Sequence, residues 1–471
     1  MSYQERFKTS EVSIWSDIRT SLSGTDKDFT SGSIGRAILV LSIPMVLEMI
    51  MESVFAVVDI FFVSKLGADA IATVGITESL MTLIYAIAIG FAMATTAVVS
   101  RRYGEREYDK AALTGVQAIL AAILVSIPIA VLGGVFAPQL LVLMGAEGEI
   151  VTEFSIYTTI MFSTNTVIML IFIINAVFRG AGDANISMRA LWIANGINIV
   201  LDPVLIFGLW IFPELGIAGA AIATSIGRGI GVLYQIYKLF DGKTRINVLK
   251  KHLITRWDIM SNLIRVSLGG IGQFIIATSS WIGLVRIIAE FGSISLAGYT
   301  IAVRILIFSI LPSWGMSNAA ATLVGQNLGA GKPARAEKST WYSAFANMVF
   351  LGIVGIFFFT NAELLMRIFT TDIAIIEIGA KCLRVMSYGY LAYAFGMVII
   401  QAFNGAGDTL TPTLINLVCF WIVEIPLAYV LAMEFDLAEE GVFYSIVIAE
   451  TLLGIIGFIL FKRGKWKTTQ V

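Results

Sequence analysis

The sequence predicts an all-α membrane protein with twelve transmembrane helices, arranged as two six-helix bundles that are related by a parallel pseudo-twofold repeat. Three observations support this fold class: an apolar composition, twelve long apolar windows, and motifs that recur at one constant spacing. Of the 471 residues, 57% are hydrophobic and only 14% are charged, and the mean hydropathy is +0.85. Soluble domains are nearer to about 45–50% apolar and 25% charged residues. We therefore expect the chain to lie in a lipid bilayer.

Twelve windows are each long enough to cross a hydrocarbon layer of about 30 Å. Because lipid offers the backbone no hydrogen-bond partners, we expect every window to be helical. The windows are 34–65, 69–101, 109–136, 149–178, 184–211, 216–240, 257–291, 294–327, 334–360, 371–403, 411–433 and 440–462.

These windows divide the chain into two predicted lobes, 34–240 and 257–463, joined by a linker at 241–256. An N-terminal arm, 1–33, precedes the first lobe, and a tail, 464–471, follows the second. For residues 10–24 of the arm, a short helix at the membrane interface and an unstructured segment are both open.

The repeat is visible in paired motifs. FRGAGD (178–183) recurs as FNGAGD (403–408), SRRYGE (100–105) pairs with GQNLGA (325–330), and LGADAIATVGI (66–76) pairs with FGSISLAGYTI (291–301). All three pairs have the same offset of 225 residues. Since each half has six helices, both halves enter the membrane in the same direction. The pseudo-twofold axis is then expected to run along the membrane normal.

Basic residues predict the orientation. The N-terminus, alternate loops and the C-terminus hold 24 of the 32 Lys and Arg residues, if Arg179 is counted with the loops. The opposite loops hold only Lys65 and Arg367. Because cytoplasmic loops are enriched in Lys and Arg, both termini are expected to be cytoplasmic. We expect a multi-pass protein of the cell (inner) membrane that acts as a monomer.

Several function classes are disfavoured. A net charge of −1 and a pI near 6.0 give no basic surface for nucleic acid. One histidine, His252, and two distant cysteines, Cys382 and Cys419, are too few for a zinc cluster, a disulfide framework or a thiol relay. The phosphate-binding pattern GxxxxGK[ST] does not occur. We therefore expect neither an enzyme nor an organic cofactor.

The segment NIVLDPVLIFG (198–208) places polar groups inside an apolar window. Asn198 and Asp202 share a helix face, and Pro203 loosens the preceding turn because it lacks a backbone donor. A charged residue at bilayer depth costs about 2.5–3.5 kcal/mol on insertion scales, so such residues are usually functional. The side-chain oxygens of Asn198 and Asp202 are suited to bind sodium, and a proton on Asp202 would serve a proton-driven transport cycle equally well. At the offset of 225, Val423 and Leu427 stand opposite, so only the first lobe is expected to bind an ion.

The first window carries an acidic stripe. Glu48, Glu52 and Asp59 fall within about 40° of each other on a helix, along roughly 16 Å of its length. We expect this stripe to line a wet cavity. The alternatives are a buried lock between helices for Asp59 and Asp202, and local packing for Glu48 and Glu52. In the sixth window, residues 219, 223, 227 and 231 are all Gly or Ala, which predicts close helix packing.

Taken together, VVDIFFVSKLGADAIA, the paired RGAGD and NGAGD, NIVLDPVLIFG, GIAGAAIAT and VGQNLGAGKPARA resemble the multidrug and toxic compound extrusion (MATE) family of secondary transporters. The resemblance covers nearly the whole chain. It implies export of small organic cations or drugs in exchange for inward sodium or protons, by rocking of two bundles. It also implies a coupling-ion site at Asp59, Asn198 and Asp202, which a sodium ion could occupy. Thr224 is expected to join this site, with a bond to a carbonyl of its own helix as the alternative.

Within the family, substrate contacts are expected at Glu48, Glu52 and, in the second lobe, Glu424, for which an ion pair with a basic neighbour is the alternative. The NorM branch tends to add a glutamate in helix 7 and an aspartate in helix 10. Neither is present at mid-depth, so the chain resembles the DinF-like branch more closely.

Two rival functions fit the sequence less well. A lipid-linked saccharide flippase of the same superfamily would need Arg or Lys in its cleft for an anionic headgroup, whereas this cleft is expected to be acidic. A channel is disfavoured because paired bundles suit rocking better than a permanent pore.

Overall fold

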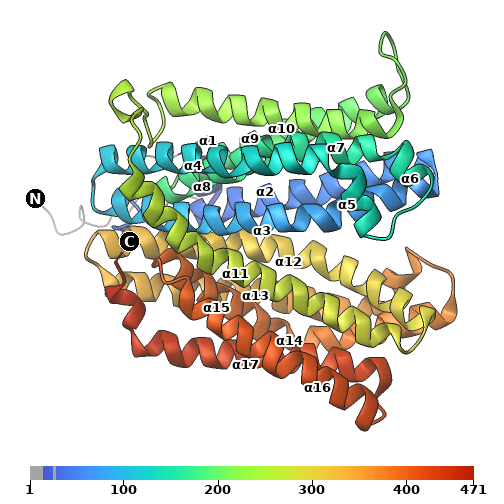
Figure 1. Cartoon of the computed structure of the whole chain (residues 1–471). Helices are drawn as coiled ribbons and strands as arrows, with labels where there is room; N and C mark the ends of the chain where they lie inside the picture. Colours follow the sequence, from blue (N-terminus) through green and yellow to red (C-terminus); the bar gives the residue numbers. More distant parts are fainter. Residues whose placement is uncertain (1–13, 25–27, 471) are drawn as a thin grey trace, which may run out of the picture.

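The computed structural model describes residues 14–24 and 28–470. Parts of the predicted N-terminal arm (residues 1–13 and 25–27) and Val471 of the tail lie outside the described residues. The described chain forms two stacked helical lobes (Figure 1). The first half, blue to green, makes one lobe, and the second half, yellow to red, makes the other.

The first lobe follows a short N-terminal helix, α1 (Ile14–Ser23), so residues 14–23 of the segment 10–24 are helical. Its elements are α2 (Ile34–Val63), η2 (Ser64–Leu66), α3 (Ala68–Gly104), α4 (Tyr108–Val135), α5 (Ala137–Leu143), α6 (Glu149–Thr152), α7 (Ser155–Ser163), α8 (Asn165–Ala181), α9 (Ala184–Ile206) and α10 (Gly216–Phe240).

A linker with one short turn, η3 (Lys250–His252), leads to the second lobe. This lobe contains α11 (Trp257–Ala289), α12 (Ser293–Gly329), α13 (Pro333–Arg367), α14 (Ile373–Gly405), α15 (Leu410–Asn416), η4 (Leu417–Glu424), α16 (Ile425–Tyr429), η5 (Val430–Glu434), α17 (Ala438–Arg463) and η6 (Lys465–Thr468).

The predicted fold class is confirmed, since the described residues form helices at all twelve windows. By length and composition, 11 helices among the described residues could cross a membrane, and α2, with 30 residues, runs beside them. Two windows are less regular than expected. The fourth is broken into α6, α7 and α8, with a break at Thr164, whose hydroxyl donates to the carbonyl of Ile160 at 2.8 Å. The eleventh contains two π-helical stretches, η4 and η5, on either side of a segment with Pro426, which has no backbone donor.

The repeat is visible in the helix bounds. Helices α3 and α12 begin and end 225 residues apart. Their contact is reciprocal: a Cβ atom on Gly104 would lie 2.0 Å from the carbonyl oxygen of Gln326, and one on Gly329 would lie 2.1 Å from that of Arg101. Real side chains do not approach backbone this closely, so both positions require glycine. The two lobes therefore meet backbone to backbone at the C-terminal ends of α3 and α12.

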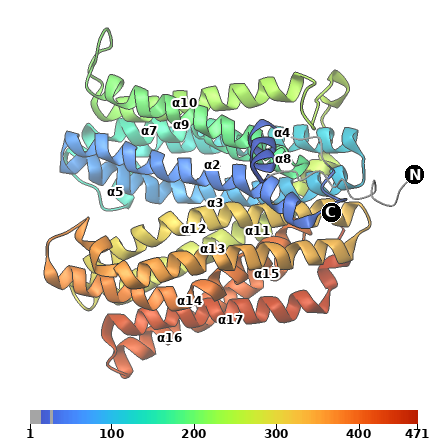
Figure 2. The same ribbon diagram turned by 180° about the vertical axis from the view of Figure 1, so that it is seen from behind.

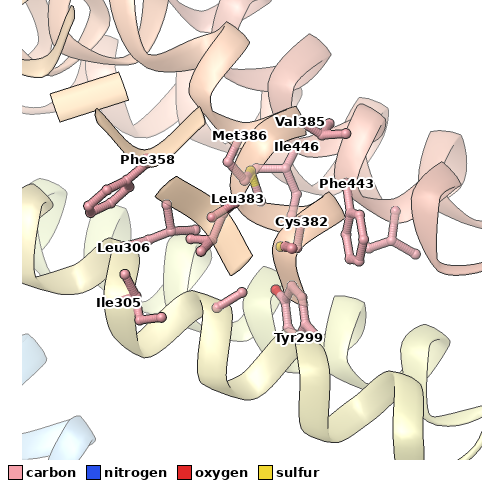
Figure 3. Close-up of a cluster of buried hydrophobic side chains, with 14 of the residues drawn as sticks. Tyr299, Ile305, Leu306, Phe358, Cys382, Leu383, Val385, Met386, Phe443 and Ile446 are labelled. Atoms are coloured by element: carbon pink, nitrogen blue, oxygen red, sulfur yellow. The ribbon is translucent and has the colours of Figure 1, made fainter. Parts of the chain in front are cut away.

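Each lobe has its own apolar core. In the second lobe, Figure 3 shows side chains of α12, α13, α14 and α17 converging around Leu383 and Met386. The ring of Tyr299 stacks on that of Phe443 with centroids 6.1 Å apart. Between the lobes, α11 packs on α3 and α12 packs on α2. Each lobe thus has its own packed core, and the two lobes share an interface.

At the end of the molecule where α1 and the C-terminus lie, each terminal segment is bonded by a residue of the opposite lobe (Figure 2). From α13 of the second lobe, Arg335 donates to the carbonyls of Ser31 and Gly32 at 2.8 and 2.9 Å. From α3 of the first lobe, Arg101 donates to the carbonyl of Thr469 in the tail at 2.7 Å. Together with the glycine contacts, these bonds close this end of the interface.

Candidate functional site

Close packing of α9 on α10 builds the polar site predicted from NIVLDPVLIFG. A Cβ atom on Gly227 would lie 2.5 Å from the carbonyl oxygen of Ala194, and one on Gly219 would lie 2.6 Å from the backbone of Leu205. The predicted role of these small residues in helix packing is therefore confirmed. Because the helices approach so closely, polar side chains on their facing surfaces can bond directly.

Three of the four predicted ion ligands form a hydrogen-bonded chain. The side-chain amide of Asn198 donates to Asp202 Oδ1 at 3.2 Å and to Thr224 Oγ1 at 3.1 Å. All three residues are buried, and Asp202 is 0% exposed. Thr224 therefore contacts the site from α10, as expected.

The same site holds oxygen atoms that are buried and have no hydrogen-bond partner among the described residues: Asp202 Oδ2, Asn198 Oδ1 and Asp59 Oδ1. Asp59 comes from α2, which packs on α9, the helix that carries Asn198 and Asp202. Burying such atoms without a partner is costly, and carboxylate and amide oxygens are hard ligands. The arrangement is therefore suited to hold a proton or a small cation.

A sodium ion would have to use mixed ligands. The described residues contain no group of three or more His, Cys, Asp and Glu side chains that could hold a metal. Asp59 and Asp202 would supply charge, and Asn198 and Thr224 would supply neutral oxygens. The backbone carbonyl of residue 199, one turn earlier than Pro203 on α9, is a further candidate ligand, because proline has no N–H to donate to it.

Next to this site, a cavity of about 280 Å³ lies between the two lobes. Its second-lobe wall is neutral, with the apolar side chains of Phe274, Leu311 and Trp314 beside the amides of Asn318, Gln401 and Asn404. Its first-lobe wall carries all of the charged groups. The first-lobe lining residues are Glu48, Met49, Glu52, Tyr85, Ile89, Ala92, Met93, Thr96, Ile171, Phe172, Asn175, Arg179, Leu191 and Arg228.

The structure places Glu48 and Glu52 in this cavity, but the expectation of an acidic cleft is wrong. Glu48 Oε1 lies 3.3 Å from the guanidinium of Arg179, and Glu52 Oε1 lies 2.7 Å from that of Arg228. Counting Arg179 with the loops was also wrong, since it is buried in the last turn of α8. The cavity therefore holds two carboxylates and two guanidinium groups, with no net charge.

Neutral amides extend this network and were missed from the sequence. Asn195 donates to Glu52 at 3.0 Å, Asn175 donates to Glu48 at 3.2 Å, and Gln235 donates to Asn175. Spacing could have revealed Arg228, because it follows Thr224 by one helical turn inside an apolar window, where an arginine is a functional signal. The same spacing relates Asn175 to Arg179.

Glu424, expected to contact substrate, is not among the residues that line the cavity. It is 2% exposed inside the second lobe, where Ser280 donates to its Oε2 at 2.6 Å. It is the last residue of the π-helical stretch η4. The alternative, an ion pair with a basic neighbour, is not seen among the described residues either.

The comparisons with known proteins agree with this architecture. The sequence model of the MatE family matches residues 44–204 and 271–430, one match in each lobe and together more than half of the chain. The chain is 25% identical to the probable multidrug resistance protein NorM of Thermotoga maritima, over 93% of this chain and 94% of that protein. It is 23% identical to the multidrug export protein MepA of Staphylococcus aureus, over 92% and 94%.

A solved structure of a multidrug resistance MATE transporter in an outward-facing conformation is 26% identical and superposes with a TM-score of 0.87, covering 94% of this chain and 98% of that one. Both lobes, and the glycine contacts between them, belong to the part that these matches cover. The chain therefore belongs to the MatE family of multi-pass membrane transporters.

Proposed function

We propose that this protein is a secondary active antiporter that exports organic cations or drugs in exchange for inward sodium or protons. The observation that carries this proposal is the buried chain Asp202–Asn198–Thr224, where Asp202 Oδ2 and Asn198 Oδ1, like Asp59 Oδ1 on α2, have no hydrogen-bond partner within the part of the chain that the structure describes. Such atoms inside a lobe favour an ion as their partner. The names of the relatives, which describe multidrug resistance and export, support drugs as the cargo.

In this proposal the coupling site and the cavity communicate through the first lobe. Asp59 lies on α2, as do Glu48 and Glu52, and Thr224 and Arg228 lie one turn apart on α10. An ion that changes how α9 and α10 pack would therefore move the first-lobe wall of the cavity. Differential binding of the ion in the two conformations is what drives such a shift.

The proposed state is outward-facing, with both termini in the cytoplasm and the protein in the cell membrane. The lobes are closed where the termini and most Lys and Arg residues lie, and the positive-inside rule makes this end cytoplasmic. The likeness to a transporter solved in an outward-facing conformation supports the same assignment.

One observation favours the flippase alternative: two arginines line the cavity, where they could bind an anionic headgroup. Each is already paired with a glutamate, however, so the cavity has no excess positive charge for a pyrophosphate group. Matches to proteins named for drug export also favour the antiporter.

The test uses the purified full-length chain and ethidium as a fluorescent organic cation. We expect ethidium to bind, and sodium (at constant ionic strength, set with potassium) or acid to release it. Asp202→Asn should bind ethidium but lose the ion-induced release. Ethidium binding that responds to neither ion would overturn the proposal.

A further inference from the structure

A second large pocket, here called the α15–α17 pocket, lies within the second lobe, apart from the cavity between the lobes. It has a volume of about 340 Å³ and lies between α15 and the last turns of α17. Helix α17 is on the side of the second lobe away from the first (Figures 1 and 2). The volume is at the lower end of the range of about 300–1,000 Å³ that is typical of ligand sites.

Three charged residues line this pocket, namely Asp408, Arg463 and Lys465. None of the three forms an ion pair within the part of the chain that the structure describes. Asp408 is half-buried, and the two basic residues are exposed. By contrast, Lys462, the residue before Arg463, lies 3.9 Å from Glu337 and does not line the pocket. The pocket therefore offers two positive groups and one negative group to a ligand.

The wall beside these charges is apolar and continues onto the outer surface of the lobe. Leu414, Val418, Ile456 and Leu460 line the pocket. Leu414 is 52% exposed, and Val418 is 38% exposed. Exposed apolar side chains on a membrane-spanning lobe are expected to contact acyl chains. Charged groups and a lipid-facing apolar wall thus meet in one pocket.

In the first lobe, a segment of the linker fills the place that corresponds to this pocket. The motif FNGAGD (403–408), which supplies Asp408, has its counterpart in FRGAGD (178–183). There, the linker residues Ile246 and Val248 are 1% and 4% exposed and belong to the same buried apolar cluster as Phe178. Among the described residues that follow α17, only Lys465 lines the pocket, so the second lobe keeps it open.

The linker also brings a positive charge to the aspartate of the first lobe. The backbone N–H of Arg245 donates to Asp183 Oδ2 at 2.7 Å, and the Arg245 guanidinium lies 3.8 Å from Asp183 Oδ1. The corresponding residue, Asp408, accepts only from the backbone N–H and the hydroxyl of Thr411 among the described residues, at 3.1 and 2.7 Å. The second lobe therefore lacks both the apolar side chains and the cation that the linker supplies to the first.

The mixture of charges selects among phospholipids. Basic pockets between membrane helices bind anionic headgroups, and Arg463 and Lys465 alone would favour such a lipid. An anionic headgroup would, however, place a second negative charge beside Asp408. A headgroup with both a phosphate and an ammonium group can partner all three residues, because phosphate accepts charge-assisted hydrogen bonds and ammonium donates them.

We propose that the α15–α17 pocket binds one phospholipid with an ethanolamine headgroup, from the leaflet at this end of the molecule. The phosphate accepts from Arg463 and Lys465, and the ammonium group donates to Asp408, as Arg245 does to Asp183. An acyl chain lies along the apolar wall, in the place that the linker fills in the first lobe. This site is separate from the transport path, so it does not depend on the proposed function.

Native mass spectrometry of the purified full-length protein tests this by counting bound lipids. The three probes have the same oleoyl chains: dioleoyl-phosphatidylethanolamine, dioleoyl-phosphatidylethanol, which lacks only the amine, and dioleoyl-phosphatidylglycerol. We expect the first to bind about 3- to 10-fold more tightly than the others, between the values for exposed and buried charged hydrogen bonds, because Asp408 is half-buried. Equal or tighter binding of phosphatidylglycerol would overturn the choice of headgroup.

One variant tests the ammonium contact. Asp408→Asn keeps an oxygen that can accept from the N–H of Thr411 but loses the negative charge. It should lower the affinity for phosphatidylethanolamine to that for phosphatidylethanol, without weakening phosphatidylethanol. The matched acidic control is Glu290→Gln, which removes an exposed carboxylate paired with Arg286, outside the pocket. A preference for phosphatidylethanolamine that survives in Asp408→Asn would contradict the contact.

A second variant tests the phosphate contact. Replacing both Arg463 and Lys465 with Gln should weaken all three lipids, because all three carry the phosphate. The matched control, Lys462→Gln, removes a positive charge next to Arg463 without changing the pocket wall, and it should leave all three affinities unchanged. Equal losses in the double variant and in Lys462→Gln would show a general effect of surface charge and would overturn the site. Since no ion gradient or drug is present, the result leaves the antiporter proposal untouched.

Discussion

Asp202→Asn is the most informative single change to the first lobe. Asp202 is 0% exposed, accepts one hydrogen bond from Asn198, and has a second oxygen with no partner. The variant keeps an oxygen to accept from Asn198 but loses the formal charge that would hold the ion. Since a bond to a charged group contributes about 1.5–3 kcal/mol, ion affinity should fall about 10- to 100-fold. Insertion should not suffer, because an amide is cheaper to bury than a carboxylate.

The assay is ethidium efflux from proteoliposomes with equal amounts of reconstituted protein, driven first by a sodium gradient and then by a pH gradient. We expect little driven efflux from Asp202→Asn and normal efflux from Glu290→Gln, the surface control. Efflux by Asp202→Asn at the wild-type rate and wild-type ion dependence would refute the assignment of the coupling site.

Three further predictions concern closure, the terminal arm and charge. Gly104→Ala would place a Cβ atom 2.0 Å from the Gln326 carbonyl oxygen, so distances between spin labels on the two lobes should lengthen at the end where α3 and α12 meet. Gly229→Ala, a control with open space around it, should leave these distances unchanged. Burial would raise the pKa of the Asp28 carboxyl, but hydrogen bonds from Thr30 and the charges of Arg106 and Lys332 hold that pKa below its ordinary value. The Asp28 carboxylate thus stabilises the folded protein above its unfolded pKa, and this stabilisation is lost as the pH falls through its folded pKa. At neutral pH, Asp28→Asn should therefore speed amide hydrogen exchange at residues 29–32. Unchanged exchange there would contradict the prediction. We expect more than one positive charge to enter for each monovalent drug cation that leaves. Drug flux should then rise with an inside-negative voltage set by valinomycin, since 100 mV adds about 2.3 kcal/mol per net charge. Drug flux that does not depend on voltage would instead indicate one-for-one exchange.

Much of the fold followed from patterns that single segments carry. Apolar length located the helices, and the constant offset of 225 predicted the two lobes, because duplicated segments that enter the membrane in the same direction fold alike. The bounds of α3 and α12 keep that offset at both ends. The breaks in the fourth and eleventh windows were not predicted, since they depend on local hydroxyl bonds and on Pro426 rather than on hydropathy.

Helical spacing predicted the part of the site that lies on one helix, and the family resemblance added Asp59 and Thr224 from other helices, but the partners of the two cavity glutamates were missed. Asn198 and Asp202 are one turn apart on α9, so their shared face followed from spacing. The partners of Glu48 and Glu52 come from α8 and α10, and only the packed structure brings Arg179 and Arg228 to them. An acidic stripe on one helix thus became a neutral cavity. Glu424 does not line the cavity either, because it is buried inside the second lobe, where Ser280 donates a hydrogen bond to it.

Ion entry that depends on substrate tests the central proposal most directly. Proteoliposomes containing the wild-type chain are loaded with ethidium, and inward movement is followed with radioactive sodium and with an internal pH dye. The proposed antiport predicts that internal ethidium accelerates entry of one of these ions, and that Asp202→Asn abolishes the acceleration. Sodium and proton entry that are both unaffected by internal ethidium, in vesicles where ethidium still leaves, would contradict ion-coupled export.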